Sequence, residues 1–183
     1  MCGIFGVWST DGQPVDPCLA ARALQTLAHR GPDDHGAAGW DGHGPVRATR
    51  DAGALGGSRV VLAHRRLSIL DLSEAGWQPM LSADGRYALV FNGEIYNFVE
   101  LRRELEAAGH AFRSHSDTEV LLRAWEQWGP GALPRLVGMF ALAVLDTRTG
   151  EVSLARDPFG IKPLYYARWR GGWAFASEIK ALL

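Results

Sequence analysis

Apolar and polar positions alternate along several short stretches of the chain, which is the pattern of half-buried strands. The stretches with this pattern, or with an apolar run of strand length, are residues 3–8, 60–69, 87–91, 137–145, 151–156, 164–169 and 173–176. The last four form two hairpins across turns at 146–150 and 170–172, and Asp84-Gly85 signals another hairpin before the strand at 87–91. We expect that strand to stop at Asn92-Gly93-Glu94.

A helix is predicted between the first two strands. Asp16 is its N-cap, and its apolar stripe consists of Leu19, Ala23, Leu24, Leu27 and Ala28. Gly31 would end the helix in a left-handed conformation. Residues 29–36 are then a polar loop. Residues 41–58 are rich in Gly, Ala and Arg without periodicity, and they are predicted to be an exposed excursion.

Two further helices follow the strand at 87–91. Asn97 and Glu100 nearly match a capping box, and Gly109 ends that helix. Ser116 and Glu119 have the same capping-box spacing and predict the start of another helix. The apolar side of that helix consists of Val120, Leu121, Ala124, Trp125 and Trp128. Strands, separate helices and terminal hairpins in this order predict an α+β fold with stacked antiparallel sheets and helices packed outside them.

Composition narrows the class of protein. The chain has 183 residues, 47% of them apolar, which suits one core and a single domain over residues 1–183. Its 19 basic and 20 acidic residues are dispersed, so neither nucleic acid nor a membrane surface is an expected partner. The longest uncharged apolar run, 136–145, is about half of what a bilayer requires, and the first residues lack the basic-then-apolar pattern of a signal peptide. We expect a soluble, cytoplasmic protein.

Two cysteines are too few for a disulfide framework. Cys18 is interpreted as a packing residue. Cys2 directly follows the initiator Met1, so removal of Met1 would give it a free α-amine beside its thiol. The thiolate is a nucleophile, and the amine can take the thiol proton and later return it to a leaving amine. Taken alone, Cys2 favours an ordinary packing role at the start of a buried strand.

Other residues could serve that thiol. Asn92 can donate from its side-chain amide and Gly93 from its backbone N–H, which would together stabilise an oxyanion. In isolation an Asn-Gly pair more often marks an ordinary turn. Arg66 could bind a carboxylate, whereas Arg65 points to the other face of its strand. Asp117 and Glu94 are candidates for binding an ammonium group, although Asp117 could equally complement a helix dipole.

Competing chemistries find little support. The histidines show no zinc-ligand spacing, so no metal site is predicted. Residues 53–58 are rich in glycine but lack the Lys-Ser/Thr ending of a phosphate-binding loop.

Several segments together carry a family resemblance. They are Met1-Cys2-Gly3-Ile4, HRGPDD at 29–34, LAHRRLSILDLS at 62–73, GWQPM at 76–80, FNGEIYN at 91–97, SDTE at 116–119 and RDPFGIKPLYY at 156–166. In this collinear order, over essentially the whole chain, they resemble the class II (N-terminal nucleophile) glutamine amidotransferases. The closest resemblance is to the glutaminase domain of asparagine synthetase. It implies the four-layer αββα sandwich of N-terminal-nucleophile hydrolases.

The resemblance also implies residue roles. Cys2 would be the nucleophile with its freed amine as base, and Asn92 and Gly93 would form the oxyanion hole. The implied substrate contacts are Arg66 with the glutamine α-carboxylate, Asp117 and Glu94 with the α-amine, and the 29–34 loop, including Arg30, as a flap over the site. Glutamine would be hydrolysed through a thioester to glutamate and ammonia, without metal or cofactor.

In the family that this chain resembles, a synthetase domain that uses ATP and Mg follows the glutaminase domain. We expect it to be absent from this chain and to act as a partner in cis or in trans. Asparagine is the expected product, and a non-aspartate acceptor is an alternative. A catalytically silent glutamine-binding or docking module, or an amidase for another amide, are the competing functions. The oligomeric state stays open, with a homodimer as one option.

Overall fold

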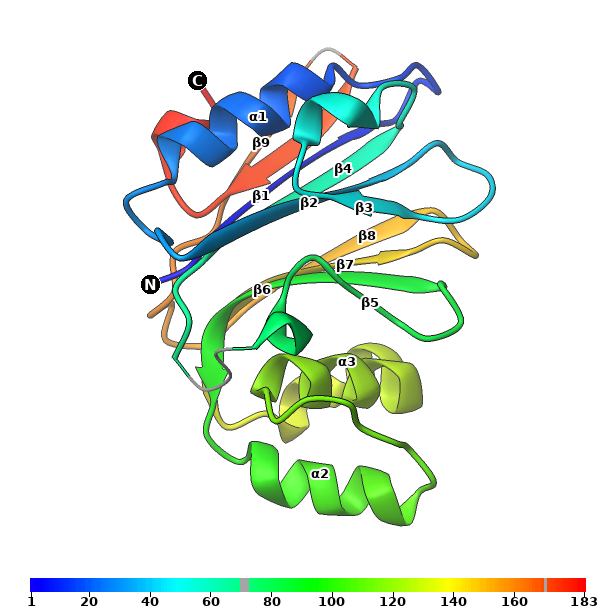
Figure 1. Cartoon of the computed structure of the whole chain (residues 1–183), viewed down its shortest axis with the longest axis vertical. Helices are drawn as coiled ribbons and strands as arrows, with labels where there is room; N and C mark the ends of the chain where they lie inside the picture. Colours follow the sequence, from blue (N-terminus) through cyan, green and yellow to red (C-terminus); the bar gives the residue numbers. More distant parts are fainter. Residues whose placement is uncertain (70–72, 170) are drawn as a thin grey trace.

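The structure is a computed structural model that describes residues 1–69, 73–169 and 171–183. Two antiparallel sheets face each other, and helices cover their outer faces (Figure 1). Helix α1 (Pro17–Thr26) lies over one sheet; helix α3 (Asp117–Trp128) packs on the other, with α2 (Phe98–Ala107) packed against α3. The predicted α+β, four-layer αββα arrangement is confirmed.

The larger sheet has the strand order β3-β2-β4-β1-β10-β9. Its strands are β1 (Gly3–Ser9), β2 (Asp34–Trp40), β3 (Arg47–Thr49), β4 (Val60–Arg66), β9 (Tyr165–Trp169) and β10 (Gly172–Ala176). The smaller sheet has the order β5-β6-β7-β8, with β5 (Met80–Leu81), β6 (Tyr87–Ile95), β7 (Gly138–Asp146) and β8 (Glu151–Arg156). Short 3-10 helices are η1 (Ala52–Leu55), η2 (Glu74–Gly76), η3 (Gly129–Arg135) and η4 (Ile179–Ala181).

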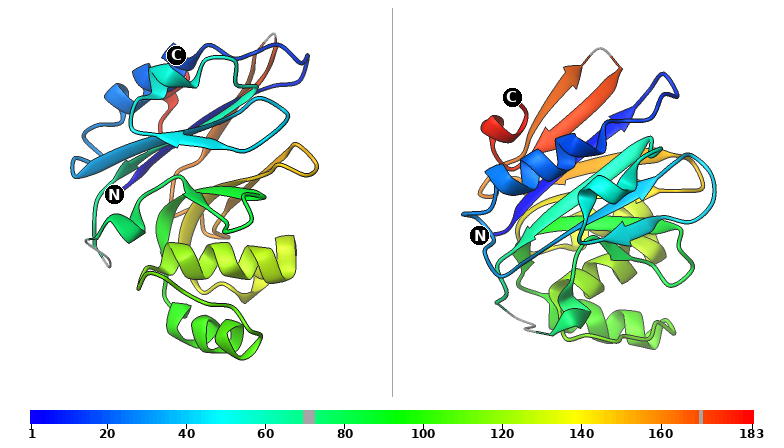
Figure 2. Two further views of the ribbon diagram at one scale, coloured as in Figure 1. Left: turned by 45° about the vertical axis from the view of Figure 1, so that its right-hand side comes forward. Right: turned by 45° about the horizontal axis from the view of Figure 1, so that its top comes forward.

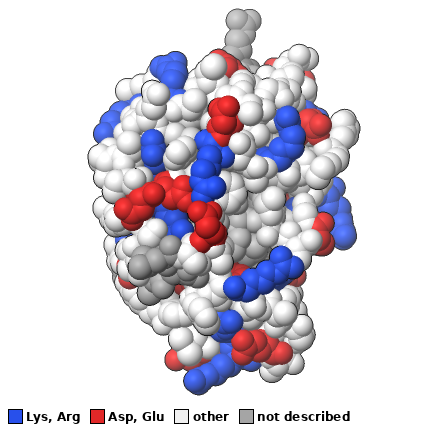
Figure 3. All heavy atoms as spheres, in the orientation of Figure 1, with Lys and Arg blue, Asp and Glu red and all other residues white. Residues whose placement is uncertain are grey.

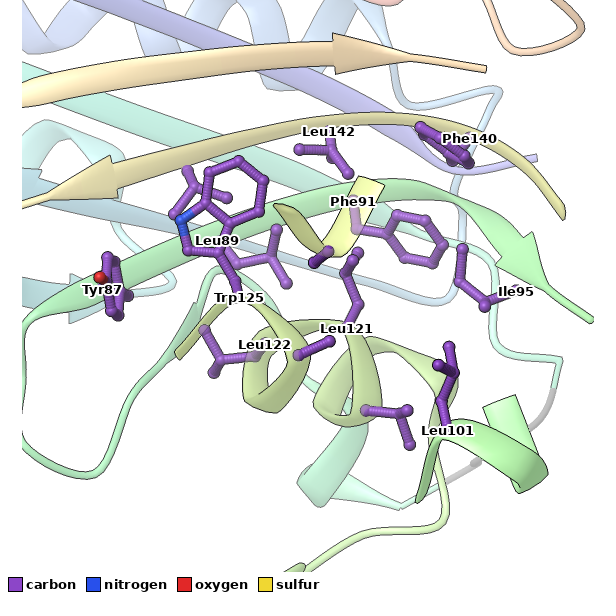
Figure 4. Close-up of a cluster of buried hydrophobic side chains, with 14 of the residues drawn as sticks. Tyr87, Leu89, Phe91, Ile95, Leu101, Leu121, Leu122, Trp125, Phe140 and Leu142 are labelled. Atoms are coloured by element: carbon purple, nitrogen blue, oxygen red, sulfur yellow. The ribbon is translucent and has the colours of Figure 1, made fainter. Parts of the chain in front are cut away.

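Each interface between layers has its own apolar core, because successive strand residues point to opposite faces of a sheet. Beneath α1, Phe5 and Val61 pack with Leu24. Between the sheets, Ile4, Leu62, Val90 and Phe175 form a second cluster. Beneath the smaller sheet a third cluster joins the strands to α3 (Figure 4), and it includes Leu89, Phe91, Leu121, Trp125 and Leu142.

The first helix is shorter than predicted. It ends at Thr26, and Gly31 does not adopt a positive φ. Gly31 is needed for a different reason, because a Cβ there would overlap the backbone of Arg65 and Arg66. Within this helix Leu19 is 36% exposed, and Cys18 is exposed as well. The predictions of a buried Leu19 and a packing role for Cys18 are therefore wrong.

The Gly- and Ala-rich stretches contain more structure than predicted. Strand β2 begins at Asp34, within the predicted loop, and β3 and η1 lie in the predicted excursion of 41–58. Ala52 and Leu55 are buried in the core beneath α1. Small side chains lack the periodic contrast that identifies a strand, and these segments are ordered by pairing with β4 and packing on α1.

Strand ends also differ from the prediction. β4 stops at Arg66 instead of residue 69. β6 continues through Asn92-Gly93-Glu94 to Ile95, because these residues pair with Phe140, Met139 and their neighbours on β7. Tertiary pairing thus overrides the local turn preference of Asn-Gly. Residues 70–72 of the 62–73 motif, and Arg170 of the predicted 170–172 turn, lie outside the described residues.

The later helices follow the predictions closely. Gly109, with φ +94°, follows the end of α2, and the Ser116 side chain accepts a hydrogen bond from the Glu119 backbone N–H as the N-cap of α3. Asn97 makes no side-chain cap. Its side chain instead binds the backbone at the end of η3. It donates to the Arg135 carbonyl and accepts from the Val137 N–H.

The surface carries both signs of charge, with basic and acidic groups interspersed on the face in Figure 3. This pattern agrees with the formal net charge of −1. Among the described residues, no helix has the length and apolar character needed to cross a membrane.

Candidate active site

The space between the two sheets changes from apolar to polar along its length. On β4 the residues facing the smaller sheet are Val60, Leu62, His64 and Arg66, and on β6 the corresponding row is Ala88, Val90, Asn92 and Glu94. On the β1 side the same face carries Ile4 and, one step before the strand, Cys2. The N-terminus lies at this polar end, beside the gap between the sheets (Figure 2).

A pocket of about 190 Å³ opens there. It is lined by Met1, Cys2, Arg66, Leu67, Ser68, Ile69, Gly76, Gln78, Phe91, Asn92, Gly93, Glu94, Ser116, Asp117, Thr118 and Lys162. Six of the seven predicted site residues line this one pocket, although they come from the N-terminus, β4, β6 and α3. Their convergence results from stacking the two sheets.

The Cys2 thiol lies at the end of β4. Its Sγ accepts a hydrogen bond from the Leu67 N–H at 3.4 Å and lies 3.6 Å from the Leu67 carbonyl oxygen. Burial raises the pKa of the Cys2 thiol above its ordinary value, an effect that the Leu67 hydrogen bond opposes. A neighbouring base is therefore needed to form the thiolate near neutral pH.

Asn92 and Gly93 meet the requirements for donors to an oxyanion. Asn92 is 1% exposed, and within the described part of the chain its Nδ2 has no hydrogen-bond partner. An unsatisfied buried donor is costly, and a ligand oxygen would satisfy it. Gly93 has to be glycine, because a Cβ there would overlap the Met139 carbonyl oxygen on β7.

The charged residues lie around the same space. Arg66 is 8% exposed, and its Nη1 donates to the Ser73 carbonyl at 2.9 Å. Asp117 lies in the first turn of α3, and its Oδ2 accepts from the Ile95 N–H at 3.0 Å. Burial, with a further contribution from the nearby negative charge of Glu94, raises the pKa of Asp117 to about 6. A cationic ligand group would relieve both effects.

Arg30 lies behind the nucleophile and is not among the residues that line the pocket. Its Nε donates to the Cys2 carbonyl at 2.9 Å, and its Nη1 donates to Glu178 Oε1 at 3.0 Å. Burial disfavours ionisation of Glu178, but hydrogen bonds from Arg30, Lys180 and His29 lower its pKa to about 2. The geometry thus differs from the expected flap contact, because Arg30 supports the backbone of Cys2 from the protein side.

Several pocket residues had no predicted role. Gln78 is 5% exposed, its Nε2 donates to Thr118 Oγ1 at 3.3 Å, and its Oε1 accepts from the Phe91 N–H at 2.7 Å. Lys162 is 6% exposed and reaches the pocket from the β8–β9 connection. Gln78, Thr118 and Lys162 lie in the motifs GWQPM, SDTE and RDPFGIKPLYY. Their place in these motifs is the sequence feature from which a role in the site could have been predicted. Among the described residues, no three His, Cys, Asp or Glu side chains are grouped to hold a metal ion.

Comparisons with known proteins agree with this geometry. A family model described as a glutamine amidotransferase domain matches residues 1–183. A putative glutamine-hydrolysing asparagine synthetase of Mycobacterium tuberculosis is 43% identical over all of this chain and 28% of its own length. Asparagine synthetase 1 of Bacillus subtilis is 41% identical over all of this chain and 27% of its own length. The chain thus spans little more than a quarter of these relatives.

A solved structure shares the fold. Glutamine phosphoribosylpyrophosphate amidotransferase from B. subtilis, complexed with ADP and GMP, superposes with a TM-score of 0.84 at 25% identity, covering 99% of this chain and 43% of that one. The layer order and the N-terminal position of Cys2 fit the N-terminal-nucleophile hydrolase fold of that structure. The chain belongs to the class II glutamine amidotransferase domain family, and it is homologous to the N-terminal part of asparagine synthetases.

Proposed function

We propose that this domain hydrolyses the side-chain amide of L-glutamine through a thioester on Cys2 and supplies the ammonia to a synthetase. The observation that supports this most directly is the pocket itself. A single space of amino-acid size is lined by a thiol, by charges of both signs, and by a buried amide donor that has no hydrogen-bond partner among the described residues. Family membership makes glutamine the expected substrate.

In the proposed mechanism, removal of Met1 frees the α-amine of Cys2. The amine takes the thiol proton, and the thiolate attacks the amide carbon of glutamine. The tetrahedral oxyanion accepts hydrogen bonds from Asn92 Nδ2 and the Gly93 N–H. Collapse breaks the carbon–nitrogen bond, and the nitrogen leaves as ammonia with the proton held by the amine. Water, deprotonated by the same amine, then hydrolyses the thioester to glutamate and restores the thiol.

Recognition of the amino-acid head uses the charges in the pocket. Arg66 would bind the α-carboxylate with its planar guanidinium, and Asp117 and Glu94 would bind the α-ammonium. An amide without this head would offer no charged group to Arg66, Asp117 and Glu94, which argues against a general amidase. Arg30 would act by holding the Cys2 backbone. All of these steps use groups of the chain, so the proposed reaction requires no metal or cofactor.

The proposed partner is a synthetase domain that uses ATP and Mg²⁺, with aspartate as the ammonia acceptor. An apolar loop close to the pocket supports a docking role. Phe159 and Ile161 are 88% and 56% exposed, and Lys162 beside them lines the pocket. The loop is well organised, because the Asp157 carboxylate accepts hydrogen bonds from the N–H groups of Phe159, Ile161 and Lys162. Exposed apolar groups on an ordered loop suit a protein interface.

The docking proposal is tested with a purified synthetase domain from a relative, added with aspartate, ATP and Mg²⁺. Phe159→Ser should leave glutamate release unchanged and lower the yield of asparagine per glutamate. Equal yields for the variant and the wild type would refute this docking loop. If ammonia is consumed with an acceptor other than aspartate, the proposal that the product is asparagine is wrong.

Intact mass and product release test the glutaminase itself. We expect loss of Met1, one covalent adduct from a glutamine-like thiol-reactive analogue, and release of glutamate and ammonia from glutamine. Cys2→Ser should abolish both the adduct and the glutamate, whereas Cys18→Ser, a matched change on the exposed face of α1, should retain both. A processed protein that binds glutamine but forms no adduct and no glutamate would instead be a silent binding module.

A further inference from the structure

Strand β6 loses its neighbour on one side just where the site begins. β5 pairs with β6 only at Leu89 and Ala88. On the other side of β6, β7 continues alongside to Ile95. Beyond Leu89, one edge of β6 therefore lacks a strand partner in the described structure, and the backbone groups on that edge require other partners.

The register shows which groups face that open edge. The Phe140 carbonyl accepts from the Asp157 N–H, and the Phe140 N–H donates to the Asp157 side chain, so both point away from β6. Gly93, which lies opposite Phe140, must then point its own N–H and carbonyl away from β7. Phe91 and Ile95 lie two residues to either side and share this direction. The open edge therefore presents the backbone N–H and carbonyl groups of Phe91, Gly93 and Ile95, with Gly93 in the middle.

Side chains from β4, from α3 and from the segment before β5 bind the backbone at the outer two positions. The Ile95 N–H donates to Asp117. The Phe91 N–H donates to Gln78 Oε1 at 2.7 Å, and the Phe91 carbonyl lies 3.1 Å from His64 Nε2. Both backbone groups of Phe91 on the open edge therefore have a side-chain partner, directly before Asn92. Gly93, between the fixed positions, turns its N–H to the pocket that it lines.

His64 is built as a donor. It is 1% exposed, and within the described residues its Nδ1 has no partner. A carbonyl can only accept, so the proton of the neutral ring lies on Nε2 and the Phe91 carbonyl receives it. Burial lowers the pKa of His64 to about 3, so the ring stays neutral near neutral pH. A group that does not titrate in that range and does not line the pocket suits a positioning role.

We propose that His64 and Gln78 are positioning residues that replace the missing strand and aim the Asn92 amide and the Gly93 N–H at the reacting carbonyl oxygen. This inference rests on the proposed glutaminase function. The two side chains come from different places, His64 from β4 of the opposite sheet and Gln78 from the segment before β5. Because His64 belongs to β4, which pairs with the strand that follows Cys2, its contact with Phe91 also fixes how far the oxyanion donors lie from Cys2. A displacement of about 1 Å can slow an enzymatic step by about 10²-fold.

Kinetics of His64 variants test the proposal. His64→Leu removes the donor, and it should lower kcat by about 10- to 100-fold while KM for glutamine changes less than about threefold. His64→Gln places a donor near the position of Nε2 and should recover most of the lost kcat. His43→Leu, in the exposed loop between β2 and β3, is the matched control and should behave as wild type. Gln78→Met should show the same loss in kcat as His64→Leu.

A second readout separates positioning from general damage to the fold. A γ-aldehyde analogue of glutamine adds the Cys2 thiol across its carbonyl: sulfur bonds to the carbon, the thiol proton goes to the former carbonyl oxygen, and that oxygen of the hemithioacetal occupies the oxyanion hole. Glutamate binds through its head without needing that hole. In His64→Leu the aldehyde should bind more weakly by about the same factor as kcat falls, whereas the inhibition constant of glutamate should stay close to wild type. Thermal unfolding and active-site titration measure which fraction of each variant is folded and catalytically competent, so that kcat can be given per competent molecule.

The outcomes distinguish this inference from the function beneath it. Equal losses of aldehyde and glutamate affinity in His64→Leu, or a kcat that is explained by a lower competent fraction, would overturn the positioning role. A wild-type kcat in His64→Leu, while Asn92→Ala is impaired, would also overturn it and leave the glutaminase intact. A processed wild-type protein that releases no glutamate would overturn the proposed function and this inference with it.

Discussion

The guanidinium of Arg30 joins the backbone of Cys2 to the C-terminal segment of the chain. Its Nε donates to the Cys2 carbonyl at 2.9 Å while its Nη1 donates to Glu178 at 3.0 Å. Glu178 also accepts from His29 at 2.8 Å and pairs with Lys180 at 3.1 Å. The residue that precedes Gly3 and β1 is therefore held by a network that joins Arg30 to Glu178 and, through Glu178, to His29 and Lys180.

Arg30→Lys should weaken this support. A single ammonium cannot reproduce two donors in a fixed planar arrangement, so we expect kcat for glutamine hydrolysis to fall by about tenfold or more. Steady-state kinetics with thermal unfolding as a companion measurement checks this. Arg103→Lys, on an exposed position of α2, is the matched control and should be neutral. An unchanged kcat in Arg30→Lys would show that the Cys2 backbone needs no such support.

Asn92→Asp keeps the size of the side chain and replaces the Nδ2 donor with an acceptor. Because a developing oxyanion would then face a carboxylate oxygen, kcat should fall by about 10² to 10³ with little change in KM. Stopped assays of glutamate release across a range of glutamine concentrations separate the two constants. A rise in KM at constant kcat would place Asn92 in ground-state binding instead of in the oxyanion hole.

Asp117 should make both stability and binding depend on pH. Its folded pKa of about 6 lies above its ordinary value of 3.8, so the folded state holds an extra proton between these values. The stabilisation from that proton is complete below about pH 4 and is lost as pH rises through 6, a change on the order of 3 kcal/mol. Asp117→Asn should remove this slope, which chemical unfolding at several pH values would measure.

The same group predicts a substrate effect of opposite sense. Only ionised Asp117 can pair with the glutamine ammonium, so KM of the wild type should rise as pH falls below 6. In Asp117→Asn, KM should be raised at neutral pH and stay flat across this range. A wild-type KM that is constant from pH 5 to 7 would contradict this assignment of Asp117.

Gly93→Ala should damage both fold and activity. The added methyl group would overlap the backbone of Met139 and Phe140 on β7, and overpacking of this kind costs about 1–3 kcal/mol. The displaced peptide would also move the Gly93 N–H, so activity per folded molecule should fall. Gly56→Ala is the matched control, since open space surrounds that position and its φ is negative. Equal stability of the two variants would contradict the steric argument.

Most elements of the fold could be predicted from local pattern. The apolar runs of β1 and β4 reflect burial on both faces of a strand, and Ser116 as the N-cap of α3 is a local hydrogen bond. The Ala- and Gly-rich β2 was missed, because small residues give no such contrast. All seven proposed site residues lie in the sequence motifs, and the structure brings six of them into one pocket.

The amino-acid sequence by itself determined which side chains alternate, where most helices begin, and that a cysteine follows Met1. Only the tertiary structure decided that Asn92 and Gly93 lie within a paired strand, that Gly31 is needed for close backbone contact, and that Arg30 supports Cys2 from behind. It also brought Gln78 to the backbone N–H of Phe91 and His64 to its carbonyl. The reason is physical, because these contacts join segments far apart in sequence, and their geometry exists only once the two sheets have stacked.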